Sequence, residues 1–365
     1  MNTHDTRRAY ALTTAPRPKF GRGAVYGEAE DKTAWNAAVA GLGGSVLQSY
    51  EWGEFRRHGG WTPLRLLAED GSWATQVLLR RLPGVGGSLA YAPHGPLAST
   101  PEDLPAVARA VAAYAKGRGA RLLEIEPRIV DSPDLETEGF RRSANSVQPR
   151  CTLIVPVRES AEAQYAALPK GARYGIRRAL QVGIEAETSI DEKVDLEFFL
   201  DLLEETAGRQ RFGLRPRDYY RLLLRELPSA LILARREGEE RPIAGAVVLT
   251  FEDEAYYLYG ASAALEGENL YASYLVQFEA LSAARRAGAT RYDLWGIPCK
   301  PHPKHPLRGV YQFKRKFAGP GHEERYAGAY KKYLNPLQSH LARAGIKSYY
   351  TLQRLRGKSS GPIAD

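Results

Sequence analysis

The same order of secondary structure is expected twice along this chain, and this repeat limits the folds that are open to it. Each half begins with three apolar strands separated by tight turns, continues with a helix that glycine ends, and returns as a further strand. In the first half the expected elements are Leu64–Ala68, Ala74–Leu82, Ser88–Ala92, the helix Pro101–Lys116 and Arg121–Glu126. In the second half they are Ala230–Arg235, Ile243–Phe251, Ala255–Gly260, the helix Leu270–Ala287 and Tyr292–Trp295.

Two local matches give the repeat nearly one offset. Gly119 and Gly288 stand in similar contexts, and 288 − 119 is 169; Tyr91 and Tyr259 each precede a turn, and 259 − 91 is 168. A shared offset at two separate features is hard to obtain by chance. We therefore predict an α/β (α+β) protein of two similar halves, each a mixed sheet with helices.

Length, composition and charge restrict the class of protein and its partners. A chain of 365 residues fits about two domains, and 44% hydrophobic with 25% charged residues is typical of a soluble globular protein. The net charge of +9 favours a polyanionic partner, such as a nucleic acid, a phosphorylated precursor or an anionic membrane. We find no run of about 18 apolar residues, as a membrane-spanning helix would need.

The cysteines and histidines give no pattern of a metal site. Cys151 and Cys299 lie far apart in the sequence and predict neither a disulfide framework nor a metal-ligand cluster, so a reducing cytoplasm is the default expectation. His94, His302 and His305 lie in expected loops without the spacing of ligands. We expect no metal and no cofactor.

The stretch 291–319 is the candidate active-site segment. Its first part is a short buried strand that stops at Gly296 and opens into a basic, proline-rich loop. Its second part, Phe313–Phe317, places cations between aromatic rings. The other interpretation is the start of a solvated basic helix whose aromatic rings point into the core.

Two helices are expected elsewhere in the chain. Ser49 is expected to cap a helix with Glu51 in its first turn, and Ala161–Val182 carries cations at helical spacing.

These segments together resemble the FemABX family of tRNA-dependent aminoacyl ligases, which build peptidoglycan cross-bridges. The resemblance covers about Ser45 to Tyr330. It is carried by the order and spacing of Gln48–Trp52, Tyr91–Pro96, Lys170–Arg177, Glu205–Arg209, Tyr257–Ser262, Tyr292–Gly296, Gly309–Lys314 and Phe317.

The resemblance implies two tandem N-acetyltransferase-like (GNAT) domains. We expect domain 1 at 23–153, completed by 318–356, and domain 2 at 154–317, with a disordered tail at 1–22 and a flexible tail at 357–365. Some relatives carry a long helical hairpin arm in the second domain. The segment Tyr220 to Ala230 leaves no room for such an arm.

The implied reaction moves an amino acid from aminoacyl-tRNA to the side-chain amine of the third residue of the peptidoglycan stem peptide. Glycine, alanine or serine are the amino acids that such enzymes transfer, and the acceptor is lipid II or UDP-MurNAc-pentapeptide. Both substrates are polyanionic, which agrees with the basic chain. We expect a cytoplasmic monomer, and the basic C-terminal segment favours peripheral contact at the inner face of the membrane.

Roles for single residues follow by position from the resemblance. Arg56 and Arg209 would hold the phosphates of the acceptor, since guanidinium groups suit phosphate. Lys314 would stabilise negative charge at the reacting ester, with Phe313 near the terminal adenosine. The remaining candidates are Trp52, Tyr91, Tyr259 and Asp293 for the acceptor, and Lys300, Lys304 and Lys316 for the tRNA. Asp293 could contact a loop amide or the incoming amine, and no general base stands out.

Two other functions remain open at this point. An acyl-coenzyme A dependent N-acyltransferase could use the same fold, but it would need a glycine-rich pyrophosphate loop that leads into a helix. The nearest match, Arg285–Thr290, closes a helix instead. A non-catalytic RNA-binding protein is permitted by the charge alone.

Overall fold

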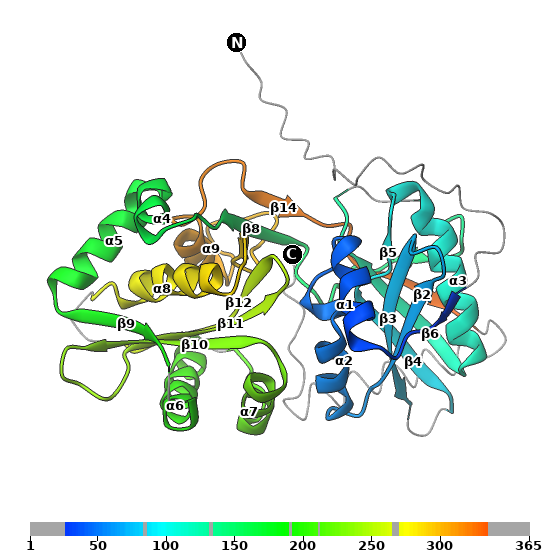
Figure 1. Ribbon diagram of the computed structural model, residues 1–365, viewed down its shortest axis with the longest axis horizontal. Helices are drawn as coiled ribbons and strands as arrows, with labels where there is room; N and C mark the ends of the chain where they lie inside the picture. Colours follow the sequence, from blue (N-terminus) through cyan, green and yellow to red (C-terminus); the bar gives the residue numbers. More distant parts are fainter. Residues whose placement is uncertain are drawn as a thin grey trace, which may run out of the picture.

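The computed structural model describes residues 26–82, 86–130, 134–189, 192–210, 212–264 and 270–334. These residues form two sheets with helices packed on them, and the two halves lie side by side (Figure 1). The tails expected at 1–22 and 357–365, and the part of the C-terminal segment beyond Leu334, lie outside the described residues. No helix in the described ranges combines the length and the apolar composition that crossing a membrane requires.

The first sheet holds strands from the N-terminal half and one strand from near the end of the chain. Its order is β1-β2-β3-β4-β6-β15-β7, with β5 paired to β3. Its strands are β1 (Tyr26–Glu28), β2 (Thr62–Ala68), β3 (Trp73–Arg81), β4 (Ser88–His94), β5 (Leu97–Ala98), β6 (Ala120–Pro127), β7 (Arg141–Arg142) and β15 (Tyr330–Tyr333). The helices of this half are α1 (Lys32–Gly41), α2 (Tyr50–Arg57) and α3 (Leu104–Gly117), with 3-10 turns at Val46–Gln48 and Pro101–Asp103.

The second sheet has the order β14-β8-β13-β12-β11-β10-β9. Its strands are β8 (Cys151–Pro156), β9 (Ile184–Thr188), β10 (Ser229–Arg236), β11 (Ala244–Phe251), β12 (Glu254–Ser262), β13 (Arg291–Asp293) and β14 (Glu323–Arg325). Its helices are α4 (Ala161–Ala167), α5 (Lys170–Gln181), α6 (Glu192–Gln210), α7 (Arg217–Glu226), α8 (Ala272–Arg286) and α9 (Arg308–Lys314). In the described residues between α6 and β10 the chain forms α7 and no helical hairpin arm, as the sequence predicted.

The two sheets share one topology, which confirms the predicted repeat of two α/β halves. In the first, three antiparallel strands are followed by α3 and by β6, which lies parallel to β4. In the second, β10, β11 and β12 are followed by α8 and by β13, parallel to β12. A further antiparallel strand then pairs with the other edge of that parallel strand: β15 pairs with β6 in the first sheet, and β8 pairs with β13 in the second.

The strand register corrects one of the two matches behind the repeat. Tyr91 faces Glu124 across β4 and β6, whereas Tyr256 faces Asp293 across β12 and β13. Glu124 and Asp293 are separated by 169 residues (293 − 124), the offset of the two glycines. Tyr91 therefore corresponds to Tyr256, and its predicted match to Tyr259 is wrong. Tyr91 and Gly119 are 28 residues apart (119 − 91), whereas Tyr256 and Gly288 are 32 apart (288 − 256), so the connection through the helix is four residues longer in the second half.

A shared apolar core joins the halves. Trp35 and Phe55, from α1 and α2, belong to the same buried cluster as Phe199 of α6, Leu223 of α7 and Val247 of β11. The predicted cap of α2 is confirmed, because the hydroxyl of Ser49 accepts a hydrogen bond of 3.1 Å from the Trp52 amide. The N-terminal half thus docks on the helices that cover one face of the second sheet.

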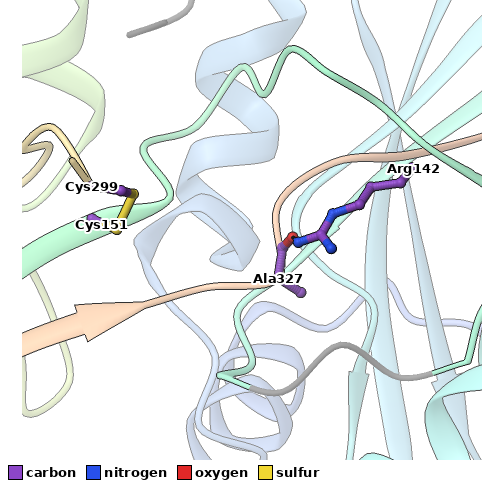
Figure 2. Close-up of a disulfide and its surroundings, with 4 residues drawn as sticks. All are labelled: Arg142, Cys151, Cys299 and Ala327. Atoms are coloured by element: carbon purple, nitrogen blue, oxygen red, sulfur yellow. Dashed lines mark hydrogen bonds between the residues drawn. A yellow bond between two sulfur atoms is a disulfide. The ribbon is translucent and has the colours of Figure 1, made fainter. Parts of the chain in front are cut away.

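Cys151 and Cys299 form a disulfide, with 5.3 Å between their Cα atoms (Figure 2). The sequence distance between the two cysteines predicted no disulfide framework, and the structure corrects that expectation. They are 148 residues apart in sequence, but the chain after β13 runs back along β8, and the Ile297 amide donates 2.9 Å to the Cys151 carbonyl. Cysteine usage consequently gives no support to the expectation of a reducing compartment.

Candidate active site

Lys314 ends α9 with its side chain buried; it is 7% exposed. Its ammonium donates hydrogen bonds to the carbonyl oxygens of Gly296, at 2.9 Å, and Trp295, at 3.3 Å. The ammonium also lies 5.6 Å from the centre of the Tyr257 ring. Burial lowers the pKa of Lys314 to about 8, although the negative charge of Asp293 acts in the opposite direction. This lysine therefore titrates near neutral pH.

Asp293 supports the turn that holds Lys314. One of its carboxylate oxygens accepts hydrogen bonds from the Trp295 amide, at 2.7 Å, and from the hydroxyl of Thr152. Trp295 has a φ of 60°, a left-handed conformation that is rare for a bulky residue. The strand ends at Asp293, two residues earlier than predicted, because the chain turns there. Burial, and then Glu254, raise the pKa of Asp293 to about 6 against the effect of Arg128.

A second group of cations and aromatic rings lies between the halves, around Arg56 of α2. Its guanidinium carbon lies 5.8 Å from the centre of the Trp52 ring and 5.7 Å from that of Trp61. The guanidinium carbon of Arg80 lies 5.4 Å from the centre of the Trp61 ring. Burial lowers the pKa of Arg56; Tyr219 opposes the shift, and Arg215 and Arg80 add to it. Arg215, just before α7, thus joins two arginines of the first half.

Buried donors in this group have no partner within the described residues. They are the indole nitrogens of Trp52 and Trp61 and Nε of Arg56. Buried N–H groups without partners are costly and commonly mark a place for a ligand or water. Unpaired donors on Arg56 and two tryptophans, with the guanidinium groups of Arg80 and Arg215 close by, suit a ligand that carries several phosphate oxygens.

The tyrosines and the second predicted arginine fall at different places. Tyr91 donates a hydrogen bond of 2.6 Å to Glu126, and its ring centre lies 6.3 Å from that of Trp61. Tyr259 lies on the other side, with its hydroxyl 3.5 Å from that of Tyr219. Both tyrosines thus border the Arg56 group. Arg209 is instead exposed, and its guanidinium donates 2.7 Å to the Ser262 carbonyl.

Two residues of this region were missed by the sequence analysis. Arg215 stands four residues before Tyr219, and the proline between them gave no sign that it would face Arg56. Glu126 ends an apolar strand directly before Pro127, which could have marked it. Its buried carboxylate accepts the Tyr91 hydroxyl and the amides of Val147 and Gln148. Burial raises the pKa of Glu126 to about 7.

An open pocket of about 730 Å³ adjoins the Lys314 segment on the surface. Its wall includes Tyr274, Phe313, Arg315 and Lys316. The rings of Phe313 and Tyr274 lie 5.3 Å apart, and Lys316 donates 2.8 Å to the Tyr274 hydroxyl. The other two predicted RNA contacts, Lys300 and Lys304, are exposed on the loop that the disulfide fastens to β8. The structure therefore places Phe313 and Lys316 in the wall of one pocket. Lys300 and Lys304 lie on the loop that precedes this segment in the sequence.

Comparisons with known proteins agree on one family. The model of the FemAB family matches residues 133–234 and 224–345. The chain is 24% identical to the lipid II:glycine glycyltransferase of Staphylococcus haemolyticus, over 74% of this chain and 84% of that protein. It is also 24% identical to the UDP-N-acetylmuramoylpentapeptide-lysine N(6)-alanyltransferase of Weissella viridescens, over 80% and 90% of the two chains.

Solved structures show the same fold. The crystal structure of FemX superposes with a TM-score of 0.73 at 22% identity, covering 86% of this chain and 98% of that one. The C-terminal domain of a putative lysylphosphatidylglycerol synthetase from Agrobacterium fabrum gives a TM-score of 0.53 at 16% identity, over 91% and 100% of the chains.

Proposed function

This chain belongs to the FemAB family, and we propose that it transfers an aminoacyl group from a charged tRNA to the side-chain amine at the third position of the peptidoglycan stem peptide. The relatives named above are a glycyltransferase and an alanyltransferase that act on peptidoglycan precursors. The chain is accordingly an aminoacyltransferase of peptidoglycan bridge formation. The tRNA donor and the identity of both substrates belong to the proposal.

The observation that carries the proposal is the placement of Lys314. Its ammonium is fixed by two backbone carbonyls, and the residue before it, Phe313, lies in the wall of an open pocket. When the amine attacks the ester carbon, negative charge forms on the carbonyl oxygen and then on the departing ribose oxygen. A buried cation stabilises such charge more than an exposed one does, because water screens it less.

The Arg56 group is proposed to hold the phosphates of the acceptor. Lipid II and UDP-MurNAc-pentapeptide both carry a diphosphate, and Arg56, Arg80 and Arg215 bring three guanidinium groups to one place between the halves. Trp52, Tyr91 and Tyr259 border this place. Arg215 is proposed for the phosphate-binding role that the sequence analysis gave to Arg209. Asp293 is proposed to position Lys314 and not to contact the incoming amine.

The choice of substrates is part of the test. The two relatives use a lipid-linked and a nucleotide-linked acceptor, so each form is needed. Glycine, alanine and serine are the donors to try first. We propose that the protein works as a monomer at the inner face of the membrane, without a cofactor.

The experiment measures transfer of radiolabelled amino acid from charged tRNA to lipid II and, separately, to UDP-MurNAc-pentapeptide. We expect product on one of them, lost in Lys314→Ala and kept in Lys116→Ala, which removes an exposed lysine at the end of α3. Arg56→Ala should raise KM for the acceptor and leave KM for aminoacyl-tRNA unchanged. Absence of transfer from any charged tRNA by the folded protein would reject the proposal.

A further inference from the structure

Four aromatic side chains form a continuous series from the exposed face of α5 to the candidate active site. Ring centres lie 5.7 Å apart for Tyr174 and Tyr271, 5.8 Å for Tyr271 and Tyr274, and 5.3 Å for Tyr274 and Phe313. Tyr174 is 46% exposed. We call these four residues the aromatic track. It starts on a helix of no assigned role and ends beside Lys314.

Cations accompany the aromatic track along its length. The sequence of α5, Lys170–Gln181, contains no acidic residue, and Lys170, Arg177 and Arg178 are exposed on it. The guanidinium carbon of Arg177 lies 5.9 Å from the centre of the Tyr174 ring. At the other end Lys316 reaches the Tyr274 hydroxyl. A ligand on the track would therefore meet aromatic rings and positive charge together.

The sequence keeps α5 in close contact with the track. A Cβ atom at Gly175 would lie 2.4 Å from the Tyr274 ring, so only glycine permits this approach. Tyr271 precedes α8 with a φ of 55°, a left-handed conformation that is uncommon for a tyrosine. Strained residues of this kind recur at ligand sites. The arrangement is thus a fixed surface and not a chance gathering of side chains.

We propose that the aromatic track binds the unpaired 3′ end of the RNA that delivers the amino acid. Bases of a single strand stack on aromatic rings while nearby cations follow the phosphates. A double helix would offer its phosphates but not the faces of its bases. The track leads to Phe313 and Lys314, where the ester must lie during transfer. This inference rests on the proposed function, because that function makes the RNA a substrate.

The test uses two uncharged RNA minihelices, one with an unpaired 3′ end and one blunt, and measures their binding to the full chain. We expect Tyr174→Leu to weaken binding of the tailed minihelix by at least about fivefold, the effect of one lost base stack, and to leave the blunt one unchanged. Tyr174→Phe keeps the ring and should bind as the wild type does. Leu180→Ala, at another exposed position of α5, is the matched control.

Salt gives a second readout that a merely structural effect would not change. Arg177→Ala should reduce the slope of log K against log salt by about 0.7, the value for one phosphate contact on a single strand. Equal binding of the tailed minihelix by wild type and Tyr174→Leu would overturn the inference. So would a loss of binding to anionic lipid vesicles in Tyr174→Leu with RNA binding intact, because the surface would then serve a membrane.

Failure of this inference differs from failure of the proposed function. If wild type and Tyr174→Leu transfer amino acid with the same KM for aminoacyl-tRNA, the track is not the RNA site and the function stands. If the wild type transfers from no charged tRNA, the function itself is rejected. Support for both requires transfer by the wild type and a raised KM for aminoacyl-tRNA in Tyr174→Leu, with kcat at saturation and KM for the acceptor unchanged.

Discussion

Arg128 donates a hydrogen bond from each of its two terminal nitrogens to the carboxylate of Glu254. The distances are 2.6 and 2.7 Å. Arg128 directly follows β6 of the first sheet, and Glu254 is the first residue of β12 in the second sheet. Both side chains are buried, at 9% and 6% exposure. Arg128 also lies 3.8 Å from Asp293, which supports the turn under Lys314. The ion pair that joins the two halves therefore contacts the residues that shape the candidate active site.

Removal of one partner of this pair should destabilise the protein strongly. Arg128→Met leaves the buried Glu254 carboxylate with the more distant Arg291, at 3.5 Å, as its counter-ion, and Glu254→Gln leaves the guanidinium with Asp293, at 3.8 Å. We expect each change to lower the free energy of unfolding by about 3–5 kcal/mol, measured by urea denaturation. The double variant R128M/E254M should recover much of the loss, because neither charge remains.

An exposed pair gives the matched control for this change. Arg109 is 61% exposed and bonds to Glu138 at 2.8 Å. Water screens this pair, so Arg109→Ala should change the free energy of unfolding by less than about 1 kcal/mol. Equal small effects at Arg128 and at Arg109 would contradict the structural role assigned to the buried pair.

The pH dependence of transfer should show the titration of Lys314. Its pKa is about 8, so its positive charge is present below that pH and is lost above it. The acceptor amine, with a pKa of about 10.4, becomes more reactive as pH rises. We therefore expect log kcat/KM to rise with pH and to level off near pH 8. Replacing Asp293 by asparagine removes the charge that raises this pKa, so the break should move to lower pH.

Lys314→Arg tests the same assignment from the other side. Arginine stays charged over the whole range, so the break near pH 8 should disappear even where the rate is reduced. A break that remains in this variant would assign the titration to another group. Asparagine at 293 can still accept the Trp295 amide, which separates the loss of charge from a loss of the turn.

The fold could be predicted from the sequence more completely than the contacts between its elements. Apolar periodicity and the matched glycines, Gly119 and Gly288, predicted two similar halves, because these signals act over a few neighbouring residues. Strand register was not predictable in the same way. The connection through the helix is four residues longer in the second half, and composition does not show where those residues were added, so the match of Tyr91 moved from Tyr259 to Tyr256.

The candidate site was likewise predictable only where its residues are neighbours in the sequence. Phe313 and Lys314 are adjacent in sequence, so the segment could be singled out before its surroundings were visible. The group around Arg56 takes Arg80 and Arg215 from two other elements, and no local pattern shows that these three approach one another. The same holds for the two cysteines. The roles of these residues in transfer stay predictions until the variants are measured.

The disulfide should contribute measurably to stability. It joins residues 148 apart in sequence, and closing so long a loop restricts the unfolded chain. We expect reduction, or the double variant C151A/C299A, to lower the free energy of unfolding by roughly 2–5 kcal/mol. Denaturation with and without a reductant checks this, and the double variant should not respond to the reductant. Two free thiols in the native protein, found by alkylation and mass, would contradict the bond.

Gly175 and Gly171 allow a matched test of how α5 meets the aromatic track. A Cβ atom at 175 would lie 2.4 Å from the Tyr274 ring, whereas at 171 its nearest neighbour is 3.7 Å away, on Lys316. Gly175→Ala should therefore cost about 1–3 kcal/mol of stability, and Gly171→Ala should be neutral or gain up to about 1 kcal/mol. Adding Tyr274→Ala to Gly175→Ala should remove most of the clash, because the two residues are coupled. If both alanine variants unfold at the same urea concentration, α5 does not need this close approach.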